Sequence, residues 1–547
     1  MSSIINSAMS GLSAAQAALS TTSNNISNYT VAGYTRQTTI LGQANSTLSG
    51  NSYYGNGVTV TGVQREYDEF ITAQLRSASA TYNAQNTQYS QISNIDDLLS
   101  TSTTSLSTSI QDFFTNVQNV VSNADDPSAR QSMLSNAQGL VNQFQTTAQY
   151  LTNMQTSVNT DITSSVDQIN TYTSQIANLN TQIAKLTTGD GTAPNDLLDQ
   201  RDQLVSSLND IVGVTVSQQD GSYIVSMGST TLVNGSKTTS LVAMPSSSDP
   251  SRITVGYVDK QAGNVEIAEK TLTTGSLGGL LAFRTQDLDT AQNQLGQLAA
   301  AFATSFNTIH KEGYDSNGDQ GTDFFNIGSP EVLSNTKNTS STTLSAEWTD
   351  TSALKASNYT VSYDGTNWSV TRQSDNVSVT ATQGTDADGN TTLSFDGLQL
   401  TVSGTPAAKD SFLVKPVQNV IGDMSVAITD ESQIAAAGAV DGASDNTNAQ
   451  KLLDLQDSKL VNGNATLAEA YASIVSTVGN KTSTLETTST TQESVVSQLS
   501  DRQQSISGVN LDEEYANLTK YQQYYTANAQ VLQTASTIFN ALIDSLG

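Results

Sequence analysis

The stretch VNLDEEYANLTKYQQYYTANAQVLQTASTIFNALIDSLG, from Val509 to Gly547, decides the fold. Its large apolar residues recur every seven positions, at Leu511, Leu518, Tyr525, Leu532, Phe539 and Leu546. A repeat of this length is typical of a helix whose apolar stripe packs against another helix. No proline interrupts the stretch, so the sequence predicts one continuous helix.

The first residues of the chain contain a matching apolar stripe. Ile5, Leu12, Leu19 and Ile26 also stand seven positions apart. An isolated helix of this length is marginal in water, so each stripe needs a packing partner. We therefore expect the two terminal helices to pair, which brings the start and the end of the chain together. The alternative is that each stripe docks separately on a globular core.

Composition restricts the partners and the compartment. The chain has 22 Lys and Arg against 50 Asp and Glu, which gives a formal net charge of −28. Nucleic acids and anionic membranes bind basic patches, so we expect neither as a partner. The absence of cysteine excludes disulfides and thiolate metal sites. We also expect no membrane insertion and no standard secretory signal, because the sequence lacks the apolar runs that both require.

Between the two ends, helical and strand patterns alternate. Asp126 and Pro127 are typical of the N-cap and first residue of a helix, which we expect to continue to about Thr187. Residues with strand-like alternation occupy 209–275 and 330–416, and Asp-Gly turns separate some of them.

The predicted fold class is therefore mixed and α-dominated. We expect an elongated helical rod built from both chain ends, as a terminal coiled coil plus a long-helix bundle, with two inserted all-β domains. The predicted domains are a terminal coiled-coil axial domain (1–65 and 505–547), a long-helix bundle domain (66–208, 276–329 and 417–504), a small β domain (209–275) and an outward-projecting β domain (330–416).

A short motif, SNNISNYTVAGYTRQ, follows the first helix. Clustered asparagines favour a helix end, because they satisfy free carbonyl groups and adopt left-handed conformations, and a glycine then supplies a turn. The residues of interest in the motif are Asn24, Asn25, Asn28, Gly33, Tyr34 and Arg36.

This motif resembles the signature of the bacterial flagellar axial family of rod, hook and hook-associated proteins. The fuller start, from Ser10-Gly11-Leu12 to Arg36-Gln37, is similar to the family members of the hook–filament junction. Other similar segments are 55–60, 64–71, 282–284, 310–315 and 323–325.

The resemblance implies a structural protein of the bacterial flagellum that serves assembly and motility. It implies secretion through the flagellar type III export channel to the extracellular hook–filament junction, after binding of an export chaperone. It also implies assembly of copies of the chain in a ring or helical layer, between the hook protein and hook-associated protein 3.

We expect assembly to be coupled to folding of the terminal helices, which have no fixed partner in the monomer. Motif residues would fix the turn out of the first helix. The expected assembly interface consists of Ile5, Leu12, Leu19, Ile26, Leu511, Leu518, Tyr525, Leu532, Phe539 and Leu546.

Candidate sites for chemistry are few. Asp315, Asn317 and Asp319 alternate as in a calcium loop, but Gln320 stands where that loop needs glycine, which favours a plain turn over incidental calcium binding. His310 is the only histidine, and no Gly-x-Ser-x-Gly motif occurs. We therefore predict no catalytic residue, cofactor or metal, and a structural protein rather than an enzyme.

Two alternatives stay open. One is another flagellar axial component, such as a hook-type subunit, although Arg36-Gln37 and the long helix of 127–187 favour a junction protein. The other is a stalked surface adhesin whose β domains bind glycans, which predicts a cleavable signal and an anchor.

Overall fold

The computed structural model describes residues 2–49, 51–100, 105–187, 193–440, 442 and 444–546. The chain divides into two compact units. The first comprises Met1–Asn83, Gln168–Ser240 and Thr490–Gly547, and the second comprises Ala84–Asp167 and Leu241–Ser489. Three of the four boundaries fall within the helices α2 (Glu69–Ser100), α4 (Pro127–Leu186) and α9 (Leu467–Ser507), and the fourth lies between Ser240 and Leu241.

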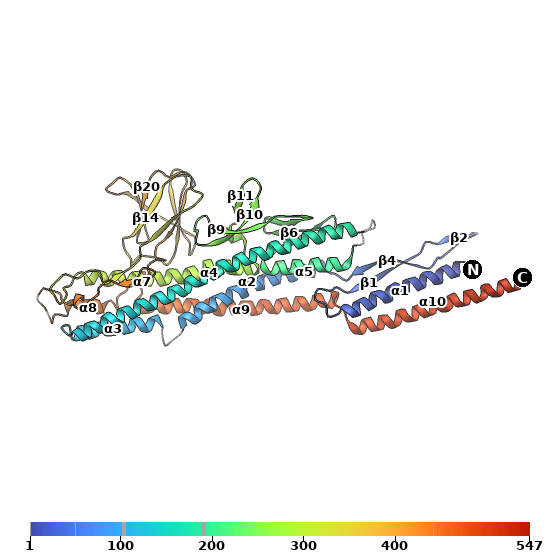
Figure 1. Cartoon of the computed structure of the whole chain (residues 1–547), viewed down its shortest axis with the longest axis horizontal. Helices are drawn as coiled ribbons and strands as arrows, with labels where there is room; N and C mark the ends of the chain where they lie inside the picture. Colours follow the sequence, from blue (N-terminus) through green and yellow to red (C-terminus); the bar gives the residue numbers. More distant parts are fainter. Residues whose placement is uncertain are drawn as a thin grey trace. The chain divides into compact units, whose positions relative to one another are not determined.

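In the first unit, the two ends of the chain form a helix pair. Helix α1 spans Ser2–Asn28 and α10 spans Leu511–Leu546, and Figure 1 shows them side by side with both chain ends together. Asn25 contacts Glu514. Gly11, fourteen residues earlier in α1, lies against Asn528, fourteen residues later in α10, so the helices run antiparallel. The predicted pairing of the terminal helices is therefore confirmed.

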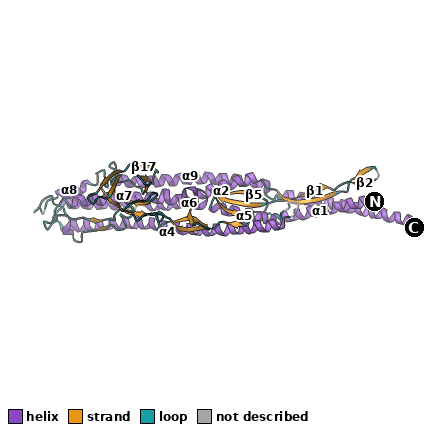
Figure 2. Ribbon diagram, turned by 90° about the horizontal axis from the view of Figure 1, so that it is seen from above, coloured by secondary structure: helices purple, strands orange, loops and turns teal. Residues whose placement is uncertain are grey.

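A two-stranded antiparallel ribbon lies along α1 (Figure 2). It consists of β1 (Gln37–Gln43) and β4 (Val58–Arg65), and it continues into the short pair β2 (Thr47–Ser49) and β3 (Ser52–Tyr54). The sequence analysis did not predict these strands. Few of their residues are buried, so the two-residue alternation by which a strand is recognised is weak here.

The rest of the first unit consists of helices and one sheet. Asn180 of α4 donates hydrogen bonds to the carbonyls of Tyr223 and Gly235, which fastens the sheet to the helix. The remaining elements of this unit are α5 (Asn195–Ile211) and the strands β5 (Thr215–Gln219), β6 (Ser222–Met227), β7 (Thr230–Asn234) and β8 (Lys237–Thr238), which pair in sequence order.

The second unit has an aromatic core. Six buried phenylalanines pack with ring centroids between 4.7 Å and 6.4 Å apart, namely Phe113, Phe114, Phe302, Phe306, Phe324 and Phe325. They lie on or beside α3 and α7, where helical spacing directs them to one face. The helical elements of this unit are α3 (Leu106–Ser122), α6 (Gly275–Ala282), a π-helical turn (Phe283–Leu288), α7 (Asp289–His310), α8 (Thr447–Asp454) and two short 3-10 turns (Glu269–Thr271 and Glu431–Gln433).

Helix α4 begins as the sequence predicts. Pro127 is its first residue, and the backbone N–H of Ser128 donates to the Asp126 carboxylate at 2.8 Å. The helix continues to Leu186, one residue before the predicted end. The cap is local, because neighbouring residues supply the donor and the acceptor, so sequence alone identifies it.

Three sheets and one short strand pair complete the second unit. A three-stranded sheet has the order β11-β10-β9, and two larger sheets have the orders β13-β21-β15-β16-β17 and β14-β20-β19-β18. Tyr359 packs edge-on against Phe395 across the two larger sheets, at 5.0 Å between centroids. The strands are β9 (Leu241–Pro245), β10 (Ile253–Asp259), β11 (Gly263–Glu266), β12 (Phe325–Asn326), β13 (Glu331–Ser334), β14 (Thr343–Trp348), β15 (Tyr359–Tyr363), β16 (Trp368–Arg372), β17 (Val377–Val379), β18 (Thr382–Thr385), β19 (Thr391–Phe395), β20 (Leu398–Ser403), β21 (Ser411–Lys415) and β22 (Ser425–Val426).

The strands within 209–275 form two sheets that belong to different units. Among the described residues, β8 is the edge strand beside β7 in the first of these sheets, and β9 is the edge strand beside β10 in the second. The strands β13 to β21 all lie within 330–416 and include the Asp-Gly turn at Asp396 and Gly397, both with positive φ.

Candidate assembly site

The buried apolar residues described in α1 and α10 are all alanines. On α1 the buried residues include Ala8, Ala14, Ala15 and Ala18, and on α10 Ala535 is buried. Gly11 lies close to α10, because a Cβ added to this residue would be 2.4 Å from the Asn528 side chain. Small side chains let two helix backbones approach closely. The fully buried apolar side chains of the two helices are therefore small, whereas none of the predicted large residues with a described side chain is fully buried.

The predicted stripe of α1 lies at the margin of this contact. Ile5, Leu12, Leu19 and Ile26 are all half-buried, and none of them is fully buried.

The predicted stripe of α10 only partly faces α1. Leu511, Leu518 and Leu532 are half-buried, but Tyr525 and Phe539 are 43% and 46% exposed. A seven-residue repeat drifts by about 20° per heptad on a straight helix, which turns Phe539 away from the face on which Leu532 lies. The side chain of Leu546 lies outside the described residues. Tyr525 and Phe539 are thus exposed in the single chain, and their place in the assembly interface stays a prediction.

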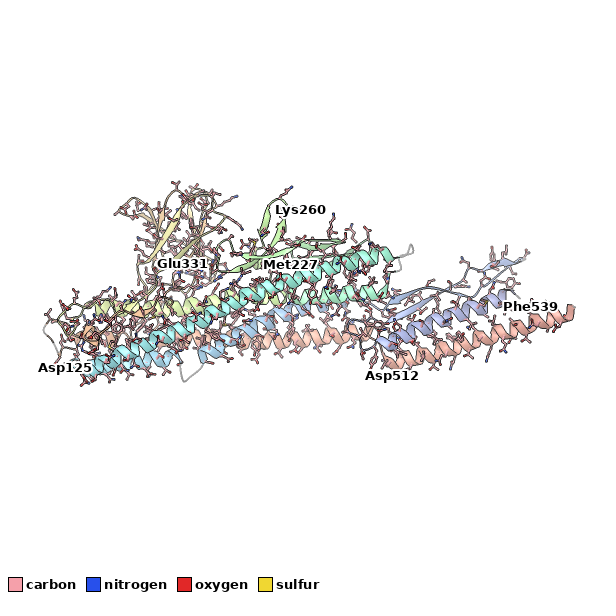
Figure 3. All side chains as sticks on the ribbon, in the orientation of Figure 1. Asp125, Met227, Lys260, Glu331, Asp512 and Phe539 are labelled. Carbon is pink, nitrogen blue, oxygen red and sulfur yellow. The ribbon has the colours of Figure 1, made fainter. Side chains whose placement is uncertain are left out.

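Further apolar side chains of α10 are exposed near its C-terminal end. Figure 3 labels Phe539 on this part of the helix and Asp512 at its start. Val531, Ile538, Leu542 and Ile543 are between 45% and 54% exposed. Such a row of exposed apolar residues on one helix is typical of a surface that another chain covers.

The motif that begins in the last turns of α1 and continues beyond it is held together by hydrogen bonds of the Asn25 side chain. Its Nδ2 donates to the Gln37 carbonyl at 2.9 Å and to a carboxylate oxygen of Glu514 at 3.2 Å. Its Oδ1 accepts from the Tyr34 hydroxyl at 2.8 Å and from the Gln37 backbone N–H at 3.0 Å. The buried carboxamide thus has its full set of hydrogen bonds, which fixes both the turn and the start of α10.

The other motif residues hold the turn around this centre. The side chain of Asn24 donates to the Tyr34 hydroxyl, and that of Asn28 donates back to Asn24. Gly33 has φ +81°, and a Cβ there would meet Gln203 at 2.7 Å, so only glycine fits. Burial and the nearby Asp199 and Glu514 carboxylates raise the pKa of Tyr34 to about 12, so its hydroxyl stays a donor at neutral pH.

Arg36 joins this turn to the start of α10. Its Nε donates to Glu514 at 2.9 Å and its Nη1 donates to Glu513 at 2.8 Å. The Glu514 side chain is only 2% exposed, whereas that of Glu513 is 58% exposed. The sequence analysis did not identify Glu514. A run of three acidic residues in an otherwise almost uncharged segment, together with the Arg36 of the motif, is the signal that could have found it.

A second polar cluster joins the turn to α5. Asp199 accepts hydrogen bonds from the Thr35 hydroxyl at 2.6 Å and from Arg65 at 2.6 Å. Arg65 also donates to Asp202, which accepts from the Tyr223 hydroxyl at 2.6 Å. The sequence analysis missed this cluster, because its members are far apart in the chain and have no shared motif.

The candidate sites for chemistry have structural roles. The Asp315 carboxylate accepts from the backbone N–H groups of Asn317 and Asp319, as in a tight turn. His310 is fully buried, with Nδ1 2.6 Å from the Thr322 carbonyl oxygen and Nε2 accepting from the Ala435 N–H. Among the described residues, no cluster of three His, Asp or Glu side chains could hold a metal ion. No helix in the described part of the chain is both long and apolar enough to cross a membrane.

Four family models match the chain. Residues 92–325 match the helical domain of the flagellar hook-associated protein FlgK, and residues 333–416 match the D2-like domain of flagellar hook-associated protein 1. Residues 5–35 match the flagella basal body rod protein, and residues 502–545 match the C-terminal region of the flagellar basal body rod FlgEFG proteins.

Whole-chain comparisons agree with these matches. The chain is 60% identical to flagellar hook-associated protein 1 of Escherichia coli strain K12 over 549 residues, with full coverage of both chains. It is also 60% identical to the Salmonella typhimurium protein of the same name over 556 residues, again with full coverage. The solved structure of the flagellar hook junction protein FlgK from Burkholderia pseudomallei covers 79% of this chain and 100% of its own, at 31% identity and a TM-score of 0.75.

Proposed function

Since the chain belongs to the flagellar hook-associated protein 1 family, we propose that its helix pair α1–α10 is the element through which it assembles. The protein is an exported structural component of the hook–filament junction of the bacterial flagellum. What we add is how the junction forms: copies of the chain pack through the terminal helices, as a ring or helical layer between the hook protein and hook-associated protein 3.

The observation that carries this proposal is the exposed apolar surface of α10. Its exposed residues, from Tyr525 to Ile543, have no covering element in the described part of the chain. Neighbouring copies would cover them, and each side chain so buried gains about 1.5–3 kcal/mol. The ten residues of the predicted interface would then be shared between the contact within the chain and the contacts between chains.

We also propose that assembly completes the folding of the terminal helices. Their fully buried apolar residues are alanines, and alanine supplies little apolar area. An isolated helix pair of this kind gains too little to offset the ordering of its residues. The helices would therefore be largely disordered in the free chain and would form when neighbouring copies arrive.

The hydrogen bonds around Asn25 and Arg36 would transmit force. They join α1, the turn and α10 to α5 through side chains that are mostly buried. Charge-assisted bonds with limited access to water resist deformation better than exposed ones. The terminal pair would thus act on the rest of the first unit as a stiff adaptor.

Before export, the exposed apolar face of α10 would require protection. We propose that a flagellar export chaperone binds it in the cytoplasm.

We further propose that the protein has no catalytic role. We also propose that it binds neither nucleic acid nor membrane, and its net charge of −28 supports this second point. We also propose that the chain ends form the axial domain and that 330–416 projects outward.

Two experiments test the proposal. Electron microscopy of flagella from a strain that lacks this protein should show hooks without filaments, and normal filaments would contradict the junction role. Amide exchange on the free chain should show α1 and α10 unprotected while α7 is protected. Strong protection of α1 and α10 in the monomer would contradict assembly-coupled folding and would leave the junction role intact.

A further inference from the structure

The β1–β4 ribbon, with its β2–β3 extension, is unusual in charge. From Gln37 to Gln64 it contains no charged residue, in a chain with a net charge of −28. Leu48 and Tyr53 stand directly opposite each other in the β2–β3 pair, and their exposed fractions are 56% and 75%. Residues opposite each other lie on the same face of a ribbon. We call Leu48, Tyr53 and the neighbouring Tyr54 (55% exposed) the tip.

A pocket of about 820 Å³ lies at the other end of α1. Side chains of α4 and α5 supply five carboxamides to its lining, namely Gln175, Asn178, Gln182, Gln200 and Gln203. The side chains of these five residues make no hydrogen bonds to described residues. The N–H2 group and the oxygen of each carboxamide are therefore available as donor and acceptor. Leu179 and Val31 add apolar surface.

These features match a tyrosine side chain. A tyrosine buries an apolar ring and needs a hydrogen-bond partner for its hydroxyl, which a carboxamide supplies as donor or acceptor. Asp196 and Asp199 also line the pocket and no basic residue does, so an anionic ligand is disfavoured. Two copies of a chain with this net charge repel each other, and uncharged surfaces are where they can approach most easily.

The tip cannot reach the pocket of its own chain. The backbone N–H of Val58, at the start of β4, donates to the Ser10 hydroxyl at 3.2 Å, which holds this end of the ribbon beside the first half of α1. The pocket is lined by Asn24 and Asn28 of the same helix. At 1.5 Å per residue, Ser10 and these residues are roughly 21–27 Å apart along α1.

We propose that the tip of one copy docks in the carboxamide pocket of a second copy. Tyr53 inserts its ring against Leu179 and Val31, and its hydroxyl bonds the carboxamides of α5. The two surfaces differ, so the contact is heterologous, and repetition of such a contact generates rings or helical layers. This inference rests on the proposed self-assembly and names one of its contacts.

The test uses the absence of cysteine from the natural chain. The double variant Tyr53→Cys with Gln200→Cys, expressed in flagellated cells and oxidised on isolated hooks, should give disulfide-linked dimers and higher multiples. The matched pair Tyr53→Cys with Ser236→Cys places the second thiol at an exposed site outside the pocket and should give at least about tenfold less of them. Equal yields from the two pairs, in cells whose filaments are normal, would overturn the docking and leave the junction role standing.

A second measurement covers the case in which the cysteine variants do not assemble. The double variant Gln200→Ala with Gln203→Ala should reduce the number of copies per isolated hook by about tenfold, because a loss of about 1.4 kcal/mol per contact is a factor of ten. The control variant Gln218→Ala lies outside the pocket and should assemble normally. Unchanged assembly of the pocket variant would overturn the proposal.

Discussion

The α1–α10 pair and the phenylalanine core of the second unit stabilise their helices in different ways. In the second unit, six phenylalanines are nearly completely buried against one another within a single chain. In the α1–α10 pair, the fully buried apolar residues are alanines, and large apolar side chains such as Tyr525 and Phe539 are exposed. The comparison indicates that a chain can fold one unit alone and reserve the apolar surface of another for its neighbours.

The largest effect is expected from a charge in the terminal pair. Leu532→Asp places a carboxylate on the half-buried face of α10 and should abolish assembly at the hook. The second unit should keep its stability within about 0.5 kcal/mol, because the change is remote from its core. Immunoblots of isolated hooks measure assembly. The control Gln533→Asp puts the same charge on an exposed neighbour and should assemble, and assembly of Leu532→Asp at the normal level would contradict the interface.

The second-largest effect is expected in the phenylalanine core of the second unit. Phe306→Ala removes a buried ring from the phenylalanine core and should lower the free energy of unfolding of the second unit by about 3–5 kcal/mol. Urea unfolding followed by tryptophan fluorescence measures it, since Trp348 and Trp368 both belong to this unit. Val377→Ala, at a residue of the same unit that is 46% exposed, should change this free energy by less than about 0.5 kcal/mol, and equal effects of the two variants would refute the assigned core.

The free energy of unfolding of the second unit should also depend on pH, because this unit contains a buried carboxyl group, Asp287. Burial raises the pKa of Asp287 from 3.8 to about 6, although its carboxylate accepts a hydrogen bond from Gln88 at 2.7 Å and Lys481 is nearby. A carboxyl with a raised folded-state pKa stabilises most below its unfolded value and loses that stabilisation as the pH rises. The free energy of unfolding of the second unit should therefore fall by about 2 kcal/mol between pH 4 and pH 7 from this group alone.

The variant Asp287→Asn tests this pH dependence. It has no proton to lose, so its free energy of unfolding should lack this fall between pH 4 and pH 7, as measured by urea unfolding at several pH values. The control Asp112→Asn changes an exposed carboxylate of α3 and should keep the fall. A wild-type slope that survives in Asp287→Asn would assign it to another group.

The smallest effect compares two adjacent carboxylates in the terminal pair. Glu514→Gln should weaken the anchoring of α10 by about 1–3 kcal/mol, because it removes a buried charge that pairs with Arg36. Glu513→Gln changes an exposed pair and should cost less than about 1 kcal/mol. The urea concentration that releases the chain from isolated hooks measures both, and equal midpoints for the two variants would contradict the difference in burial.

Much of the fold could be predicted because its signals are local. The cap at Asp126 and the start of α4 at Pro127 depend on adjacent residues. The seven-residue repeats predicted both terminal helices, since periodicity is a property of one segment. The turn at Gly33 was equally visible, because a positive φ there requires glycine.

Other features depend on residues that are far apart in the chain. Glu514 is buried only because Asn25 and Arg36 lie against it after folding, and a carboxylate on a helix is otherwise expected to face water. The strands β1 to β4 were missed because the ribbon is largely exposed, so burial leaves little pattern in its sequence.

The sequence by itself determined that both chain ends are helices with apolar stripes, that they pair, and that the chain has the motif of a flagellar axial protein. Only the tertiary structure decided which stripe residues face α1 and which remain exposed. The physical reason is that a repeat states how side chains are spaced along one helix. Which of them become buried depends on the drift of that stripe around the helix and on the small residues of α1, on which α10 packs.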